Sequence, residues 1–183
     1  MVADHQAHAH HWSIVWNTPL KRRLAREGCN FASARTVQPI CSPARASMLT
    51  GLYPHAHGVT ENDGRFGGGI DEEPRMHGRS LMELMGEPGA AWRSGFMAQH
   101  YGLHEPVPQR AWYAGDWKLV VQEDGFVELY DLDDDPHEMR NLASDEEHRN
   151  TLESLWAGLR DAMTETGDLD RRLSTVPSGS PGR

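Results

Sequence analysis

The hydrophobic pattern of the second half of the chain predicts a β-hairpin followed by an amphipathic helix. Two apolar runs, residues 117–121 and 126–132, flank a turn that contains Asp124-Gly125, which is typical of two antiparallel strands. Residues 144–147 (Ser-Asp-Glu-Glu) predict a capping box that opens a helix, and Gly167 is expected to end it. One apolar stripe lies between them at helical spacing, made of Leu152, Leu155, Trp156, Leu159 and Met163. This half therefore predicts an α+β unit in which an antiparallel sheet packs on a terminal helix.

The first half predicts shorter elements that lead into a second helix. Residues 17–28 have the cap, the early proline and the closing glycine of a short helix, and residues 29–37 alternate as a strand does. In the following segment, Ser42 is expected to be the N-cap, Pro43 the first helical residue and Gly51 the C-terminal stop. This segment contains the residues with the most reactive chemistry.

Cys41 and Arg45 are the candidate site residues of that helix. The pattern places Cys41 just before the amino end of the helix and Arg45 one turn inside it. A helix N-terminus presents unpaired N–H groups and a partial positive charge, and Arg45 adds a full one, so an anion is favoured there. On spacing alone, Cys41 is either a nucleophile or a structural cysteine.

Composition and charge exclude several classes of function. The 183 residues contain 18 Lys and Arg against 27 Asp and Glu, and the formal net charge of -9 argues against nucleic acid as a partner. No stretch approaches eighteen consecutive apolar residues, and residues 1–6 lack the basic start of a secretory signal. We therefore expect no membrane span and a cytoplasmic location. Two cysteines, Cys29 and Cys41, are too few for a disulfide scaffold.

Three segments predict little packed structure. Residues 1–16 form a His-rich arm, expected to be disordered because no carboxylate or cysteine stands at metal-ligand spacing beside its histidines. Residues 63–77 contain three consecutive glycines and predict a flexible junction, and residues 174–183 predict a disordered tail rich in Ser, Gly and Pro.

Two blocks of the sequence resemble one protein family. Cys41-Ser42-Pro43-Ala44-Arg45, followed by Thr50-Gly51 and by residues 53–59 (YPHAHGV), resembles the signature of the formylglycine-dependent sulfatases. Residues 118–142, with their KLV, ELYDL, DP and NLA segments, resemble the small C-terminal sheet domain of bacterial sulfatases. The resemblance covers residues 17–62 and 78–167.

The resemblance implies an α/β fold that is a remnant of the alkaline-phosphatase-like sulfatase fold, with a small C-terminal antiparallel sheet and terminal helix. It implies a signature segment at residues 17–62 and a C-terminal subdomain at 78–173. Between them, the junction at 63–77 replaces the central domain of the family. We therefore expect an internally deleted or truncated sulfatase.

The resemblance also implies a chemistry. A formylglycine-generating enzyme would oxidise Cys41, and the hydrate of the resulting formylglycine would attack the sulfur of a sulfate ester substrate. By resemblance Cys41 is the nucleophile and one ligand of a calcium (or magnesium) ion, and Arg45 holds the formylglycine. The other metal ligands and the acid of the family are not found in the sequence, so this chain is expected to be incomplete or inactive alone.

Three alternatives stay open. One is a non-catalytic remnant or binding module that keeps the signature loop and the C-terminal sheet. Another is a relative that hydrolyses phosphate or phosphonate esters. A third assigns a metal-binding function to the His-rich arm.

Overall fold

The computed structural model describes residues 23, 26–29, 31, 34–62, 76–87, 89–102 and 107–168. The arm at 1–16, most of the helix expected at 17–28, nearly all of the junction at 63–77 and the tail at 174–183 lie outside the described residues. The chain divides into two compact units, one made of Met1–Arg35 and Leu81–Ala90 and the other of Thr36–Ser80 and Ala91–Arg183. In the part that is described, no helix is both long and apolar enough to span a membrane.

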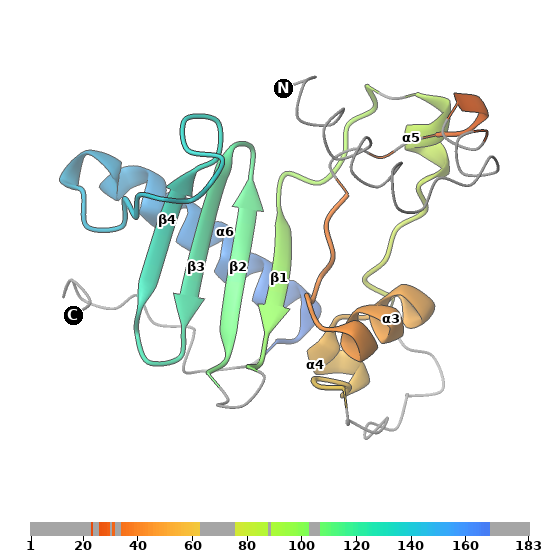
Figure 1. The fold of residues 1–183 in the computed structure, drawn as a ribbon, viewed down its shortest axis with the longest axis horizontal. Helices are drawn as coiled ribbons and strands as arrows, with labels where there is room; N and C mark the ends of the chain where they lie inside the picture. The colour runs from red at the N-terminus through yellow and green to blue at the C-terminus, as the bar shows by residue number, and fades with distance from the viewer. Residues whose placement is uncertain are drawn as a thin grey trace. The chain divides into compact units, whose positions relative to one another are not determined.

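The larger unit contains a four-stranded antiparallel sheet with the strands in chain order. The strands are β1 (Phe96–His100), β2 (Gln109–Ala114), β3 (Trp117–Gln122) and β4 (Val127–Asp131). The last helix, α6 (Arg149–Thr166), lies across one face of this sheet (Figure 1). The predicted hairpin is therefore confirmed as β3 and β4, while β1 and β2 were not predicted from the sequence.

The core lies between that sheet face and α6. In the strands, inward positions alternate, so that Met97, Trp112 and Leu119 point toward the helix. The helix buries the predicted stripe; Leu152 is partly buried at its margin. The hydrophobic core also contains these buried residues: Tyr53, Val121, Leu129, Leu142, Leu155, Trp156, Leu159 and Met163.

Trp112 packs at a point where two glycines leave room for its ring. A Cβ added to Gly95 would lie 2.0 Å from the Trp112 ring, and one added to Gly158 of α6 would lie 2.8 Å from its Nε1. The glycine in the middle of α6 therefore lets the helix approach the sheet closely, although glycine is a weak helix former.

The ends of α6 agree with the sequence prediction at one end only. Gly167 adopts a left-handed conformation with φ 74° and caps the helix, as predicted. The capping box at the other end is wrong: the segment forms a short 3-10 helix, η1 (Glu146–His148), before α6, and no side chain caps it. The carboxylate beside the expected box, Glu146, pairs with Arg149, at 2.9 Å from the arginine Nε.

The strand expected at residues 29–37 is also wrong, because none of its described residues forms a strand. A local turn explains the difference. The Thr36 hydroxyl donates to the Gln38 carbonyl at 2.9 Å, and the Gln38 N–H donates back to that hydroxyl at 3.4 Å. The chain bends there, and one backbone bond remains to the edge of the sheet, from Gln99 N to Val37 O at 2.8 Å.

The opposite edge of the sheet is covered by the loop that follows β4. The Asn141 side chain accepts from Leu129 N and donates to Val127 O, both at 3.0 Å, and Leu142 N donates to Leu129 O at 2.8 Å. The loop thus occupies the bonding groups of β4 that would otherwise be open.

The smaller unit contains the short helix α5 (Met82–Gly86) and an ion pair between Arg23 and Glu27 at 2.7 Å. Cys29 lies in this unit and is exposed.

Candidate functional site

The signature helix, α3, spans Cys41–Thr50 and begins earlier than predicted. Its N-cap is Ile40, and Cys41 is the first helical residue, so the prediction that Ser42 caps the helix is wrong. Ser42 has other partners: its N–H donates to Asn62 Oδ1 at 3.1 Å and its hydroxyl donates to Asn62 O at 3.4 Å. The helix ends at Gly51, which is left-handed with φ 68°, as predicted.

Cys41 and Arg45 lie one turn apart on the outer face of α3. Both are exposed, and they lie on one side of the helix because residues four apart share a face. Met48 and Leu49 continue this face and are 84% and 86% exposed. The helix contains no acidic residue, and Arg45 has no ion pair among the described residues. Helix dipole and guanidinium therefore combine to make this face electropositive.

The next helix, α4 (Pro54–His57), is locked to α3 by a buried hydrogen bond. His57 Nε2 donates to Ser47 Oγ at 2.9 Å, and both side chains are buried. The Val59 N–H donates to the other ring nitrogen, Nδ1, at 3.1 Å, which fixes the proton on Nε2. Burial lowers the pKa of His57, so the ring is neutral at pH 7.

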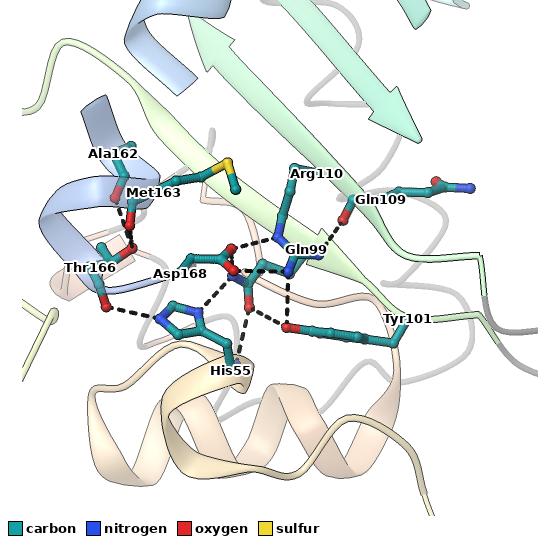
Figure 2. A network of polar contacts seen from close by, with 9 residues as sticks. All are labelled: His55, Gln99, Tyr101, Gln109, Arg110, Ala162, Met163, Thr166 and Asp168. Atoms are coloured by element: carbon teal, nitrogen blue, oxygen red, sulfur yellow. Dashed lines mark hydrogen bonds and ion pairs between the residues drawn. The ribbon is translucent and has the colours of Figure 1, made fainter. Parts of the chain in front are cut away.

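His55 of α4 connects the signature segment to the sheet and to α6, as Figure 2 shows. Its Nε2 donates to the Thr166 carbonyl at 2.9 Å, which is one of the carbonyls left unpaired at the end of α6. Gln99 of β1 donates through Nε2 to His55 Nδ1 at 2.8 Å and to Asp168 Oδ2 at 2.7 Å. Residues 55, 99 and 166 thus join three elements that are far apart in the sequence.

Arg110 of β2 completes this buried network (Figure 2). It donates to Asp168 twice, from Nε at 2.6 Å and from Nη2 at 3.1 Å, and Nη2 also donates to the Tyr101 hydroxyl at 3.3 Å. The Tyr101 hydroxyl donates to Gln99 Oε1 at 3.2 Å. The side chains of His55, Gln99, Arg110 and Asp168 all have partners in this network, which is the condition under which such a network stabilises a fold.

The Asp168 carboxyl is held ionised by this arrangement. Burial by itself would raise its pKa, but the hydrogen bonds and charge of Arg110, together with His55 and Gln99, bring the pKa of Asp168 below its ordinary value. The network, which contains the buried ion pair of Arg110 and Asp168, therefore holds α4 in place and, through α4, also α3.

Sequence reasoning did not find this network. Gln99 and Arg110 occupy inward positions of β1 and β2, where apolar residues are expected, and this break in the alternation hid both strands. A weaker signal for both strands was present in the sequence. Gln99 lies two positions after Met97, and Arg110 lies two positions before Trp112, so each pair has the spacing of side chains on one face of a strand.

The residues present do not form a metal site. Among the described residues, no group of three or more His, Cys, Asp and Glu side chains could hold an ion. Calcium prefers six to eight oxygen ligands, and Cys41 stands on an electropositive face with no carboxylate on its helix. The metal implied by the resemblance therefore does not fit what this part of the chain offers.

Comparisons with known proteins agree with the two blocks of the sequence. The family described as "N-sulphoglucosamine sulphohydrolase, C-terminal" matches residues 67–165, and the family described as "Sulfatase" matches residues 3–91.

Individual relatives match over shorter stretches. An "Ulvan-active sulfatase" of Formosa agariphila is 50% identical over 46 residues, which are 25% of this chain and 9% of that protein. An "N-acetylglucosamine-6-O-sulfatase" of Bacteroides thetaiotaomicron is 33% identical over 78 residues, which are 42% of this chain and 14% of that protein. The chain thus spans no more than 14% of the length of these two relatives.

A solved structure has a similar fold over part of this chain. The structure of "a 2-O GAG sulfatase" superposes with a TM-score of 0.50 and 26% identity, over 60% of this chain and 26% of the other. Together with the small antiparallel sheet and C-terminal helix, this confirms the predicted fold class. Since the first family match covers more than half of the 183 residues, the chain belongs to the sulfatase family.

Proposed function

We propose that this chain carries the nucleophile-bearing part of a sulfuric ester hydrolase. In this proposal Cys41, converted to formylglycine by a formylglycine-generating enzyme, is the nucleophile position, and Arg45 holds it. The observation that supports the proposal is their shared, exposed position in the first turns of α3. A side chain that must react with both an enzyme and an ester has to be accessible.

The electropositive face of α3 favours the substrate that the proposal requires. A sulfate ester brings negative charge, and the N–H groups of the first helical turn together with Arg45 would stabilise it. The other charge-neutralising groups are not assembled among the described residues, so a complete turnover needs residues beyond them.

The substrate class we propose is a sulfated amino sugar or a glycosaminoglycan built from one. The support comes from the names of the matched family and proteins, "N-sulphoglucosamine sulphohydrolase, C-terminal", "N-acetylglucosamine-6-O-sulfatase" and "a 2-O GAG sulfatase". The family match, at residues 67–165, includes the C-terminal sheet.

The test is to co-express the chain with a formylglycine-generating enzyme and to map both cysteines by peptide mass spectrometry. We expect the aldehyde at Cys41 and unchanged Cys29. Cys29 is a matched internal control because it is also exposed, but Asn30-Phe31-Ala32-Ser33 follow it, without the proline and arginine that follow Cys41. An unmodified Cys41, under conditions that convert a control peptide, would contradict the proposal.

A further inference from the structure

Three histidines around α4 use the same ring nitrogen in the same way. His55, His57 and His77 each accept a hydrogen bond at Nδ1, from Gln99 Nε2 at 2.8 Å, from Val59 N at 3.1 Å and from Tyr53 N at 3.1 Å. A backbone N–H can only donate, so Nδ1 of His57 and of His77 carries no proton. These two rings are therefore neutral.

The same assignment holds for His55. Its Nε2 faces the Thr166 carbonyl, which can only accept, so the ring proton is on Nε2. The orientation of the Gln99 amide is fixed on both sides, because its Oε1 accepts from His55 N at 3.3 Å and its Nε2 donates to the Asp168 carboxylate. The Gln99 amide therefore cannot turn to receive a proton from His55 without losing both bonds.

The three Nδ1 bonds hold different parts of the segment around α4. His55 accepts from Gln99 of β1, His57 accepts from the N–H of Val59 just after α4, and His77 accepts from the N–H of Tyr53, the N-cap of α4. The Nε2–H bonds of His57 to Ser47 and of His55 to the Thr166 carbonyl are separate, and a protonated ring still donates them. The rings of His55 and His77 are also close to each other, with 5.8 Å between their centroids. Protons on both would repel.

We propose that His55, His57 and His77 form an acid-sensitive latch, which loosens residues 53–59, including α4, from β1 when the rings are protonated. A proton on Nδ1 places an N–H against the N–H that was donating to it. That hydrogen bond is lost and replaced by repulsion. Three such bonds hold residues 53–59, so acidification weakens one short segment at three points.

The charged and titratable groups that face these rings do not cancel this effect. The Asp168 carboxylate interacts with His55 but is already paired twice with Arg110. The Thr166 carbonyl and Glu165 of α6 favour a charged His77, but burial first and then His55 outweigh them, so the pKa of His77 is lowered; burial also lowers the pKa of His57. The remaining facing groups are Tyr53, Tyr101 and Arg93, whose Nη2 donates to His77 O at 3.4 Å.

The rest of the larger unit is built differently. β3, β4 and the middle of α6 meet through apolar side chains such as Leu119, Leu129 and Leu159, none of which titrates. His100 ends β1, and burial lowers its pKa, so β1 is expected to loosen with α4; His137 and His148 lie in or beside exposed segments after β4. The latch therefore predicts partial opening, with β2–β4 and α6 still folded.

The test is hydrogen exchange of the full chain, followed by mass spectrometry between pH 7.5 and pH 5 and corrected for the intrinsic effect of pH. Below about pH 6.5, the exchange of the amides in residues 53–59 should accelerate by at least about tenfold per pH unit, which corresponds to one proton, while β2–β4 change little. The informative variant is His77→Asn, whose Oδ1 can accept from Tyr53 N and cannot be protonated. It should move the opening to lower pH.

His57→Asn provides a second variant, because its Oδ1 can likewise accept from Val59 N. His137→Asn, in an exposed loop after β4, is the matched control and should open at the same pH as the wild type. The latch is refuted if the sheet and the signature segment lose protection together, or if both His77→Asn and His57→Asn open at the same pH as His137→Asn.

Discussion

Arg110 and Asp168 form a two-bond ion pair inside the protein, with side-chain exposures of 1% and 3%. One partner comes from the second strand of the sheet and the other from the residue after the C-cap of α6. Removing one partner of a buried pair leaves the other charge uncompensated, whereas an exposed pair contributes little.

We therefore expect Asp168→Ala to lower the free energy of unfolding by about 3–5 kcal/mol. The matched control is Asp145→Ala, which removes the exposed pair with Arg140 and should cost at most about 1 kcal/mol. Urea unfolding monitored by tryptophan fluorescence measures both. Equal losses in the two variants would contradict the role assigned to the buried pair.

Tyr130 predicts a weakening of the fold in alkali. Burial first, and then the hydrogen bond to Glu128 at 3.0 Å and nearby negative charges, raise the pKa of Tyr130 to about 12. Because the folded pKa lies above the unfolded one, this contribution to stability is full below about pH 10 and is lost as the pH rises toward 12.

The alkaline titration of phenolate absorbance should therefore include a late step near pH 12 that Tyr130→Phe removes and Glu128→Gln shifts to lower pH, while Tyr53, whose pKa burial also raises, titrates unchanged in both variants. In urea the same tyrosine should titrate near pH 10, as an ordinary phenol does. A native titration that lacks the late step would rule out this environment for Tyr130.

The packing of Trp112 predicts an unusual response to helix-favouring substitution. Gly158→Ala should improve helix propensity by about 1 kcal/mol, but its Cβ would meet the Trp112 ring, which also lies close against Gly95. Overpacking costs about 1–3 kcal/mol, so we expect a net loss of stability. Gly86→Ala, with nothing within 4 Å, is the control and should be neutral or slightly stabilising. Thermal unfolding distinguishes the two, and a stabilised Gly158→Ala would disprove the tight contact.

The site predicts negligible sulfate ester hydrolysis by this chain alone, even with Cys41 converted and calcium supplied. One missing oxyanion contact commonly lowers the rate by about 10²–10³. The described residues contain no metal-binding group that could neutralise charge together with Arg45. The measurement compares converted protein with Cys41→Ala on an activated aryl sulfate at saturating calcium, and equal rates are expected. A turnover that depends on both Cys41 and the metal would show that the site is complete.

The sequence predicted those elements whose signal is local. The hairpin β3–β4 and the stripe of α6 follow from side-chain periodicity, which depends on burial alone. The start of α3 was misplaced because Asn62, twenty residues later, engages Ser42. The strand at 29–37 was wrong because Thr36 forms a turn with Gln38.

The same distinction between local signals and long-range contacts applies to the candidate site. Cys41 and Arg45 could be proposed from the sequence, since four residues within a helix fix their common face. The network around His55 could not be, because its partners lie 44, 58 and 69 residues apart along the chain, and only the folded sheet brings them together.

The edge of β4 has a consequence for how this protein ages. The Asn141 side chain bonds to β4 as the backbone of a neighbouring strand would: its oxygen accepts from Leu129 N, and its N–H donates to Val127 O. Spontaneous deamidation would exchange that N–H for an oxygen and set a negative charge against the Val127 carbonyl. This single reaction, which changes the mass very little, would therefore break the contact that covers the edge of β4. The exposed backbone groups of that edge could then pair with strands of other chains.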